Sequence, residues 1–364
     1  MSTEHLPVSR RIRQGCGNFH RNVRRSVANP SVVDTRGSDF ARLARRISDA
    51  GLLDRRPVYY AVRLSIVVVA YLGCWALFAW VGDSWWQLLV AVALAVVFAQ
   101  IGFVSHDLGH RQVFRTRRPS DVTGLLLGNL GIGLGWGWWT SKHNRHHANP
   151  NHEDHDPDVS PAVIVWSTEQ VERSSGLPRF LARHQAFWFF PLLTLEAWHL
   201  HVASFKALLA PATKRPWMEL VLLTGHVVLY FGAVFTVLPF GKALVFLVVH
   251  QGLFGLYLGS TFAPNHKGMP VLTKNDKLDF LRKQVLTSRN VRGGLFTDVA
   301  LGQLNYQIEH HLFPNMPAPN LRKAQPIVER YCAEVGVSYL QTGLFDSYGQ
   351  ALRHLHEVGA ALRR

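Results

Sequence analysis

The sequence has few cysteines and few charged residues for its length. Its 364 residues include only three cysteines, Cys16, Cys74 and Cys332, which lie far apart. This spacing excludes a disulfide framework and indicates a reducing compartment for the parts of the chain in water. Charged residues make up 17% of the chain, whereas hydrophobic residues make up 48%. The apolar content of the chain is higher than a protein with a water-facing surface needs. We therefore expect a lipid bilayer to be its solvent.

The amino-terminal part also has no apolar stretch of the kind found in a secretory signal peptide. Its first 58 residues carry 12 arginines. We therefore expect residues 1–58 to form a basic segment in the cytoplasm. An arginine-rich, acid-poor start is also compatible with an organelle transit peptide.

Four apolar stretches have the length of about 20 residues that a transmembrane helix needs. We expect them at about residues 59–81, 85–105, 217–240 and 243–263. The short connections within each pair predict two helical hairpins. Two other apolar stretches, 122–139 and 187–200, are expected to be interfacial or re-entrant, because the first is dense in glycine and the second contains Pro191 and Glu196.

Three groups of histidines have the spacing of metal ligands on helices. They are His106 and His110; His143, His146 and His147; and His310 and His311. Residues three and four apart lie on one face of a helix, so each group can point its imidazoles in one direction. Imidazole suits iron, copper, zinc or nickel, and the set exceeds the four ligands of one tetrahedral zinc. The pattern therefore predicts two metal ions.

The side of the membrane on which these groups lie follows from the number of spans. If only the four long stretches cross, all three groups and His266, just past the last span, emerge on the side of the amino terminus. Basic residues such as Arg117, Arg118, Lys274 and Lys277 are concentrated there. The positive-inside rule makes this side cytoplasmic. We expect a membrane domain over residues 59–330, a cytoplasmic tail over 331–364, and both termini and the histidines in the cytoplasm.

The three motifs HxxxH, HxxHH and QxxHH, at 106–110, 143–147 and 307–311, resemble the histidine boxes of integral-membrane fatty acid desaturases. The resemblance covers residues 57–330, and Gln307 is similar to the front-end and acyl-lipid branches. It implies an all-α membrane fold, with four spans under a cytoplasmic helical cap, and a di-iron centre. The implied ligands are His106, His110, His143, His146, His147, His266, His310 and His311. The residues that we expect to orient these imidazoles are Asp107, Asn144, Asp156, Gln307 and Glu309.

The same resemblance implies a reaction and its partners. We expect a double bond to be introduced into a long acyl chain, carried as an acyl-lipid or as acyl-CoA, with O₂ and two electrons. No His-Pro-Gly-Gly haem motif occurs, so we expect an external donor such as a ferredoxin with its reductase. The formal charge of +15 favours an acidic carrier, although anionic lipid would be attracted equally. No nucleic-acid partner is expected.

Two other functions remain open from the sequence. A hydroxylase on the same di-iron scaffold would carry the same histidines. A membrane metal transporter would place its ionisable ligands near the middle of the bilayer, whereas these groups lie at the ends of the predicted spans.

Overall fold

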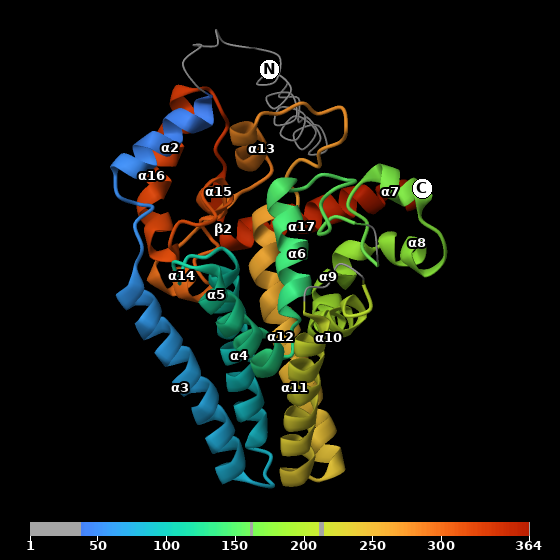
Figure 1. The fold of residues 1–364 in the computed structure, drawn as a ribbon. Helices are drawn as coiled ribbons and strands as arrows, with labels where there is room; N and C mark the ends of the chain where they lie inside the picture. The colour runs from blue at the N-terminus through green and yellow to red at the C-terminus, as the bar shows by residue number, and fades with distance from the viewer. Residues whose placement is uncertain (1–37, 161–162, 211–214, 364) are drawn as a thin grey trace, which may run out of the picture.

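Four long apolar helices form a stem, and shorter helices form a cap at one end of it (Figure 1). The computed structural model describes residues 38–160, 163–210 and 215–363. The stem helices are α3 Pro57–Val81, α4 Gln87–Gly109, α11 Pro216–Val237 and α12 Phe240–His266. Each is long and apolar enough to cross a membrane, which confirms the four expected spans.

The two hairpins of the stem pack around a buried interface between α4 and α12. The outer helices α3 and α11 leave large apolar side chains exposed; Val69, for example, is 68% exposed. In water such surfaces would be unfavourable, whereas in a bilayer they contact lipid. At the far end of the stem, Gly82 ends α3 with a φ of +62°, and Lys242 binds Asp83 at 2.7 Å, which joins the two hairpin turns.

The two apolar stretches that we expected to be interfacial or re-entrant, 122–139 and 187–200, do not form long helices. The first is divided among α5 Arg117–Gly124, the π-helix η1 Leu125–Gly131 and α6 Trp136–Ala148. The second contains α9 Gln185–Leu193 and α10 Glu196–Ala207. Among the described residues neither stretch meets the length and composition of a span, as expected. The chain therefore returns to the same end of the stem after α4.

The cap is built from short helices and one small parallel sheet. Its helices are α2 Asp39–Asp49, α7 Thr168–Arg173, α8 Gly176–Ala182, α13 Phe280–Leu286, α14 Leu295–Ala300, α15 Gln307–Leu312, α16 Ala318–Glu334, α17 Leu344–Val358 and the 3₁₀ helix η2 Gly359–Leu362. The strands are β1 Asn290–Arg292 and β2 Gln341–Gly343, with Asn290 opposite Gln341. A second buried core, with Leu43, Ile308 and Val328 among its members, joins α2, α15 and α16.

The two ends of the chain differ from the simple segments expected. Residues 1–37 of the basic segment lie outside the described residues. Of the described part, Asp39–Asp49 form α2, which packs against α13 and α16. Residues 331–364, expected to form a tail, include β2 and α17, and α17 packs on α9 and α12. This part of the chain belongs to the packed cap because the buried Ala351 and Leu355 give α17 an apolar face.

Candidate metal centre

The eight histidines of the expected ligand set come from four elements and meet where the stem joins the cap. His106 and His110 lie at the end of α4, and His266 is the last residue of α12. The other five come from α6, which carries His143, His146 and His147, and from α15, which carries His310 and His311. The eight residues divide into two groups. Within each group, the nitrogen atoms that could bind a metal lie within 4.8 Å of one another. This arrangement agrees with the expected number of crossings, which required every group to emerge at one end of the stem.

The first group contains five imidazoles: His106, His110, His143, His147 and His310. Three Nε2–Nε2 separations measure its centre: 2.9 Å from His110 to His143, 3.0 Å from His143 to His147 and 3.1 Å from His147 to His310. Nitrogens bound at right angles about 2.1 Å from one metal ion would lie about 3 Å apart. The group therefore has the spacing of ligands around a single ion.

Two properties of this first group fit a metal better than hydrogen bonds between imidazoles. The Nε2 atom of His106 is buried and has no hydrogen-bond partner in the described structure. His143 Nε2 faces two other Nε2 atoms, and one proton cannot satisfy both contacts. A cation at the centre of the group would satisfy these lone pairs together.

The second group contains His146, His266 and His311. The Nε2 atoms of His266 and His311 are 3.1 Å apart. On the opposite edge of each ring, Nδ1 faces an acceptor: Asp156 Oδ2 at 2.9 Å from His146, the Thr287 carbonyl at 3.0 Å from His266 and Gln284 Oε1 at 2.9 Å from His311. Each acceptor fixes the proton on Nδ1 and leaves Nε2 as a bare lone pair. This pattern is typical of imidazoles that bind metal.

The protonation of the site also suits a cation. Burial, reinforced by the neighbouring imidazoles, lowers the pKa of several of these histidines well below the usual value; they are His110, His143, His147, His310 and His311. Neutral imidazole is the form that binds metal, so these five residues are in the form that a metal ion requires at neutral pH.

The residues expected to orient the ligands divide into those that contact an imidazole and those that do not. Asp156 contacts His146, and the side-chain amide of Gln307 lies 2.9 Å from His266 Nε2. Asp107 is buried, lies 3.4 Å from His106 Nδ1 and is 3.9 Å from the guanidinium of Arg63. Asp156 and Asp107 therefore face the Nδ1 edge of a ring, whereas the Gln307 amide faces Nε2 of His266, the nitrogen that points into the second group.

Asn144 and Glu309 have other surroundings. Asn144 is exposed on α6, and no contact among the described residues joins it to an imidazole. Glu309 is buried and accepts hydrogen bonds from Asn290 Nδ2 at 2.7 Å and from Tyr339 Oη at 2.8 Å. Burial raises the pKa of Glu309 to about 7. Through these hydrogen bonds, its carboxyl group joins α15 to β1 and to the chain before β2. It contacts no imidazole ring among the described residues.

Sequence reasoning missed Gln284 and Thr287, because neither belongs to a histidine motif. The available signal was a glutamine in the otherwise apolar end of α13, where it is fully buried. A further residue outside the histidine motifs is Trp139, which lies in the first turn of α6. Its ring stacks on His143 with centroids 4.7 Å apart and an angle of 18° between the planes.

Among the described residues, the histidines other than these eight do not join either of the two groups. His201 and His226 bind the backbone carbonyls of Gly133 and Leu130, and His250 binds Tyr230 Oη at 2.6 Å. These contacts are the ordinary ones expected for polar groups inside a stem. His152 and His155, in the loop after the second box, pack against each other.

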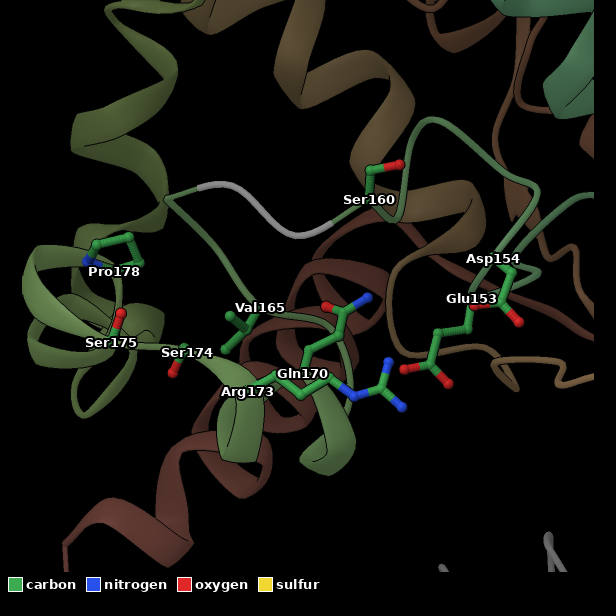
Figure 2. Close-up of a pocket in the computed structure, with 9 residues that line it drawn as sticks. All are labelled: Glu153, Asp154, Ser160, Val165, Gln170, Arg173, Ser174, Ser175 and Pro178. Atoms are coloured by element: carbon green, nitrogen blue, oxygen red, sulfur yellow. The ribbon is translucent and has the colours of Figure 1, made fainter.

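A surface hollow next to this loop is separate from the metal centre. Figure 2 shows its lining residues, which include Glu153 and Asp154 from the loop and Arg173 from α7. Its volume is about 500 Å³, and none of its lining residues is one of the eight histidines. Among the described residues, its lining residues belong to none of the groups that could hold a metal ion.

The sequence was then compared with known proteins. Residues 83–343 match the family model described as fatty acid desaturase. The chain belongs to the fatty acid desaturase family. Among its relatives, the acyl-lipid (9-3)-desaturase of Physcomitrium patens is 33% identical over 353 residues, which cover 93% of this chain and 65% of the moss protein. Fatty acid desaturase 3 of Bos taurus is 30% identical, over 88% of this chain and 73% of that protein.

A third relative that is named as a desaturase is less similar in sequence. Delta(6)-fatty-acid desaturase fat-3 of Caenorhabditis elegans is 27% identical, over 88% of this chain and 74% of that protein. The chain therefore spans about two thirds to three quarters of the length of these desaturases. The matched region of the family model contains all eight histidines of the two groups.

Replacing Asp156 by asparagine should weaken metal binding in the second group only. The Asp156 carboxylate accepts both the His146 ring proton and the Asn151 backbone N–H at 2.7 Å. An amide cannot accept as well from both, so we expect metal affinity there to fall by about 10–100-fold. Metal per chain after dialysis against a chelator measures this loss. Asp154→Asn, an exposed change in the same loop, is the control, and equal retention in both variants would contradict the role of Asp156.

Proposed function

We propose that this membrane desaturase introduces a double bond into a long acyl chain at a di-iron centre, with O₂ and two electrons. The observation that carries the proposal is the division of eight histidines into two adjacent groups, at the end of a four-helix stem. Two groups support two metal ions, and imidazole ligands are compatible with iron. The family supplies the reaction class, since the relatives described above are named desaturases.

The residues of the chain prepare the site for this chemistry in two ways. The first group offers five imidazole nitrogens and the second offers three, beside the amide of Gln307. Asp156, Gln284 and Thr287 hold the rings of the second group in place. Bound iron would supply the oxidising power to remove two hydrogens from an unactivated methylene pair, with O₂ and two electrons as co-reactants. His106, His310 and the three histidines of the second group are buried, whereas His110, His143 and His147 are partly exposed.

The substrate we propose is a long acyl chain attached to a lipid or to coenzyme A. The stem offers an apolar surface to the bilayer, and the metal centre lies at its end, next to the position of polar head groups. Expression in a host that lacks such an activity should therefore add one class of unsaturated acyl chain, detected by mass spectrometry of total lipids. A hydroxylated chain in place of the double bond would reassign the enzyme to hydroxylation, and unchanged lipids with an iron-loaded protein would contradict the proposal.

We also propose that the metal centre faces the cytoplasm. Cysteine introduced at Ser84, in the turn between α3 and α4, should be labelled from the opposite side of the membrane to cysteine at the exposed Ser160. The physical reason is that basic residues are concentrated at the capped end of the stem. The measurement is labelling by a membrane-impermeant maleimide in sealed, oriented vesicles. Labelling of both positions from one side would contradict the four crossings.

The electron donor we propose is a small acidic redox carrier that binds the basic face of the cap. Arg117, Arg118, Lys274 and Lys277 are exposed there, and opposite charges accelerate encounter. Turnover at limiting carrier should fall as salt rises past physiological strength, where the Debye length is about 8 Å. Charge reversal at Arg117 and Arg118, and separately at Lys274 and Lys277, should raise the carrier concentration needed. If neither salt nor either pair of changes affects this concentration, the basic residues serve lipid binding and topology.

A further inference from the structure

The short helix α14 carries exposed apolar side chains that no part of the described structure covers. Leu295 is 75% exposed, Phe296 is 86% exposed and Val299 is 66% exposed. We refer to these three side chains as the α14 ridge. Large apolar side chains gathered on one short element are unfavourable in water and usually mark a contact surface.

The position of α14 identifies the medium that this ridge meets. The Val299 carbonyl accepts a hydrogen bond from Gln100 Nε2 of α4 at 3.1 Å, and the Ala300 carbonyl accepts one from Tyr257 Oη of α12 at 2.7 Å. Gln100 precedes Asp107 by seven residues, so its backbone lies about 10 Å farther from the cap along α4. Both contacts are therefore made to segments inside the predicted spans. Figure 1 shows α14 beside the upper part of the stem, below the other helices of the cap at that side.

The opposite side of α14 is polar and is attached to the cap. Asp298 is buried, accepts a hydrogen bond from Asn305 Nδ2 at 2.9 Å and lies 3.6 Å from the guanidinium of Arg322 on α16. Arg292, just before α14, is exposed. An apolar ridge bordered by cationic side chains is the chemistry of an element that lies in a membrane interface.

The first turn of α17 also carries an exposed apolar side chain. β1 and β2 are parallel, and Arg292 lies opposite Gly343, so the chain leaves both strands in the same direction toward α14 and α17. Phe345, in the first turn of α17, is 86% exposed. Three residues later, Tyr348 Oη donates to the carbonyl of Ser260 in α12 at 2.7 Å. The start of α17 therefore also contacts a span.

We propose that the α14 ridge is inserted into the lipid bilayer, so that this helix is a membrane contact in addition to the four spans. The partner is the boundary between head groups and acyl chains on the side of the cap. Because α14 connects β1 to the third histidine box, its insertion holds this part of the cap at the membrane surface. The inference depends on the membrane location of the stem and not on the reaction catalysed.

The test is a measurement of lipid depth with spin labels in reconstituted liposomes. Single cysteines are introduced at Phe296 and, separately, at Leu295 in protein whose native cysteines, Cys16, Cys74 and Cys332, are replaced by alanine. The accessibility of each label to O₂, which concentrates in lipid, is compared with its accessibility to a water-soluble nickel complex. Val69, exposed on α3, is the lipid reference, and Asn275, exposed in a cap loop, is the water reference. Variants are used only if they elute as the parent protein does in size-exclusion chromatography.

We expect the ratio of O₂ to nickel accessibility at Phe296 and Leu295 to be several-fold higher than at Asn275 and to approach that at Val69. Ratios at both positions equal to that at Asn275 would overturn the proposal. The result does not depend on iron or on turnover. Failure of the desaturase assay and failure of this insertion are therefore distinguishable.

Discussion

Replacing His310 by alanine should abolish double-bond formation and lower the iron content, while the protein remains folded in the membrane. His310 is fully buried in the first group, and its Nε2 lies 3.1 Å from that of His147. Loss of a residue that only orients a ligand typically costs about 10–100-fold in affinity or activity. Loss of a ligand should exceed that range, so we expect product to fall by at least about 100-fold.

The equivalent change in the second group should remove a different ion. His146→Ala leaves only His266 and His311 in that group, so we expect iron to fall from about two to about one per chain, with product again lost. Iron and zinc are measured by elemental analysis of protein purified without chelators. The exposed His155 and His356, each changed to alanine, are controls that should keep both iron and activity.

These two variants test the division into two groups as well as the identity of the metal. Full activity in either variant would exclude the histidine from the centre. Stoichiometric zinc without iron in the parent protein would refute the iron assignment. Equal loss of both ions from His146→Ala and His310→Ala would show that the two groups bind metal only together.

Replacing Arg289 by alanine should cause a large loss of stability. Its side chain is fully buried, and its guanidinium donates to the carbonyls of Pro264 and Lys267 at 2.7 Å each. It also donates to Gln350 Oε1 at 2.6 Å. Burial lowers the pKa of Arg289 to about 10, so the group stays charged at neutral pH. These bonds join the end of α12 to α17.

The expected cost follows from the acceptors that would remain. Hydrogen bonds to a charged donor contribute about 1.5–3 kcal/mol each, and alanine would leave buried carbonyls without a partner. We expect a loss of about 3–5 kcal/mol in the free energy of unfolding, and a melting temperature lower by roughly 5–10 °C. Fluorescence-detected size exclusion after heating in detergent measures this shift.

Two comparisons make the Arg289 test specific. Arg292→Ala removes an exposed guanidinium with one longer hydrogen bond, 3.3 Å to the Gln341 carbonyl, and should leave the melting temperature nearly unchanged. Arg289→Lys keeps the charge but loses the planar fork, so an intermediate loss is expected. Because His266 lies between Pro264 and Lys267, iron should also be lost from Arg289→Ala. An unchanged melting temperature in this variant would refute the structural role of Arg289.

Some of the site could be derived from local spacing alone. The spacing of His143, His146 and His147 predicted that all three imidazoles point in one direction from one helix, and the structure places all three on α6. It did not show that His146 joins His266 and His311, while His143 and His147 join the first group. Adjacent helical residues point about 100° apart, so His146 and His147 diverge, as do His310 and His311. Which partners each ring meets depends on how α4, α12 and α15 are packed around α6.

The residues that contact the imidazole rings were harder to predict from sequence spacing than the histidines themselves. Asp156 was accessible to sequence reasoning because it lies only ten residues from His146, whereas Gln284 and Thr287 come from a helix with no histidine motif. Glu309 was expected to orient a ring because it precedes His310, but its carboxyl group binds Asn290 and Tyr339. Proximity in sequence therefore identified a neighbour of the ligands without identifying its partner.

By itself, the sequence determined the four spans, the non-crossing stretches and the eight histidines that meet at one end of the stem. These features depend on the length of apolar runs and on helical periodicity, which are local properties of the chain. Only the tertiary structure decided how the histidines divide between two groups, which side chains hold their rings, that Arg289 joins α12 to α17, and that the α14 ridge is left uncovered. The reason is physical. These features depend on distances between segments far apart in sequence, and such distances are set by the packing of the stem and the cap together.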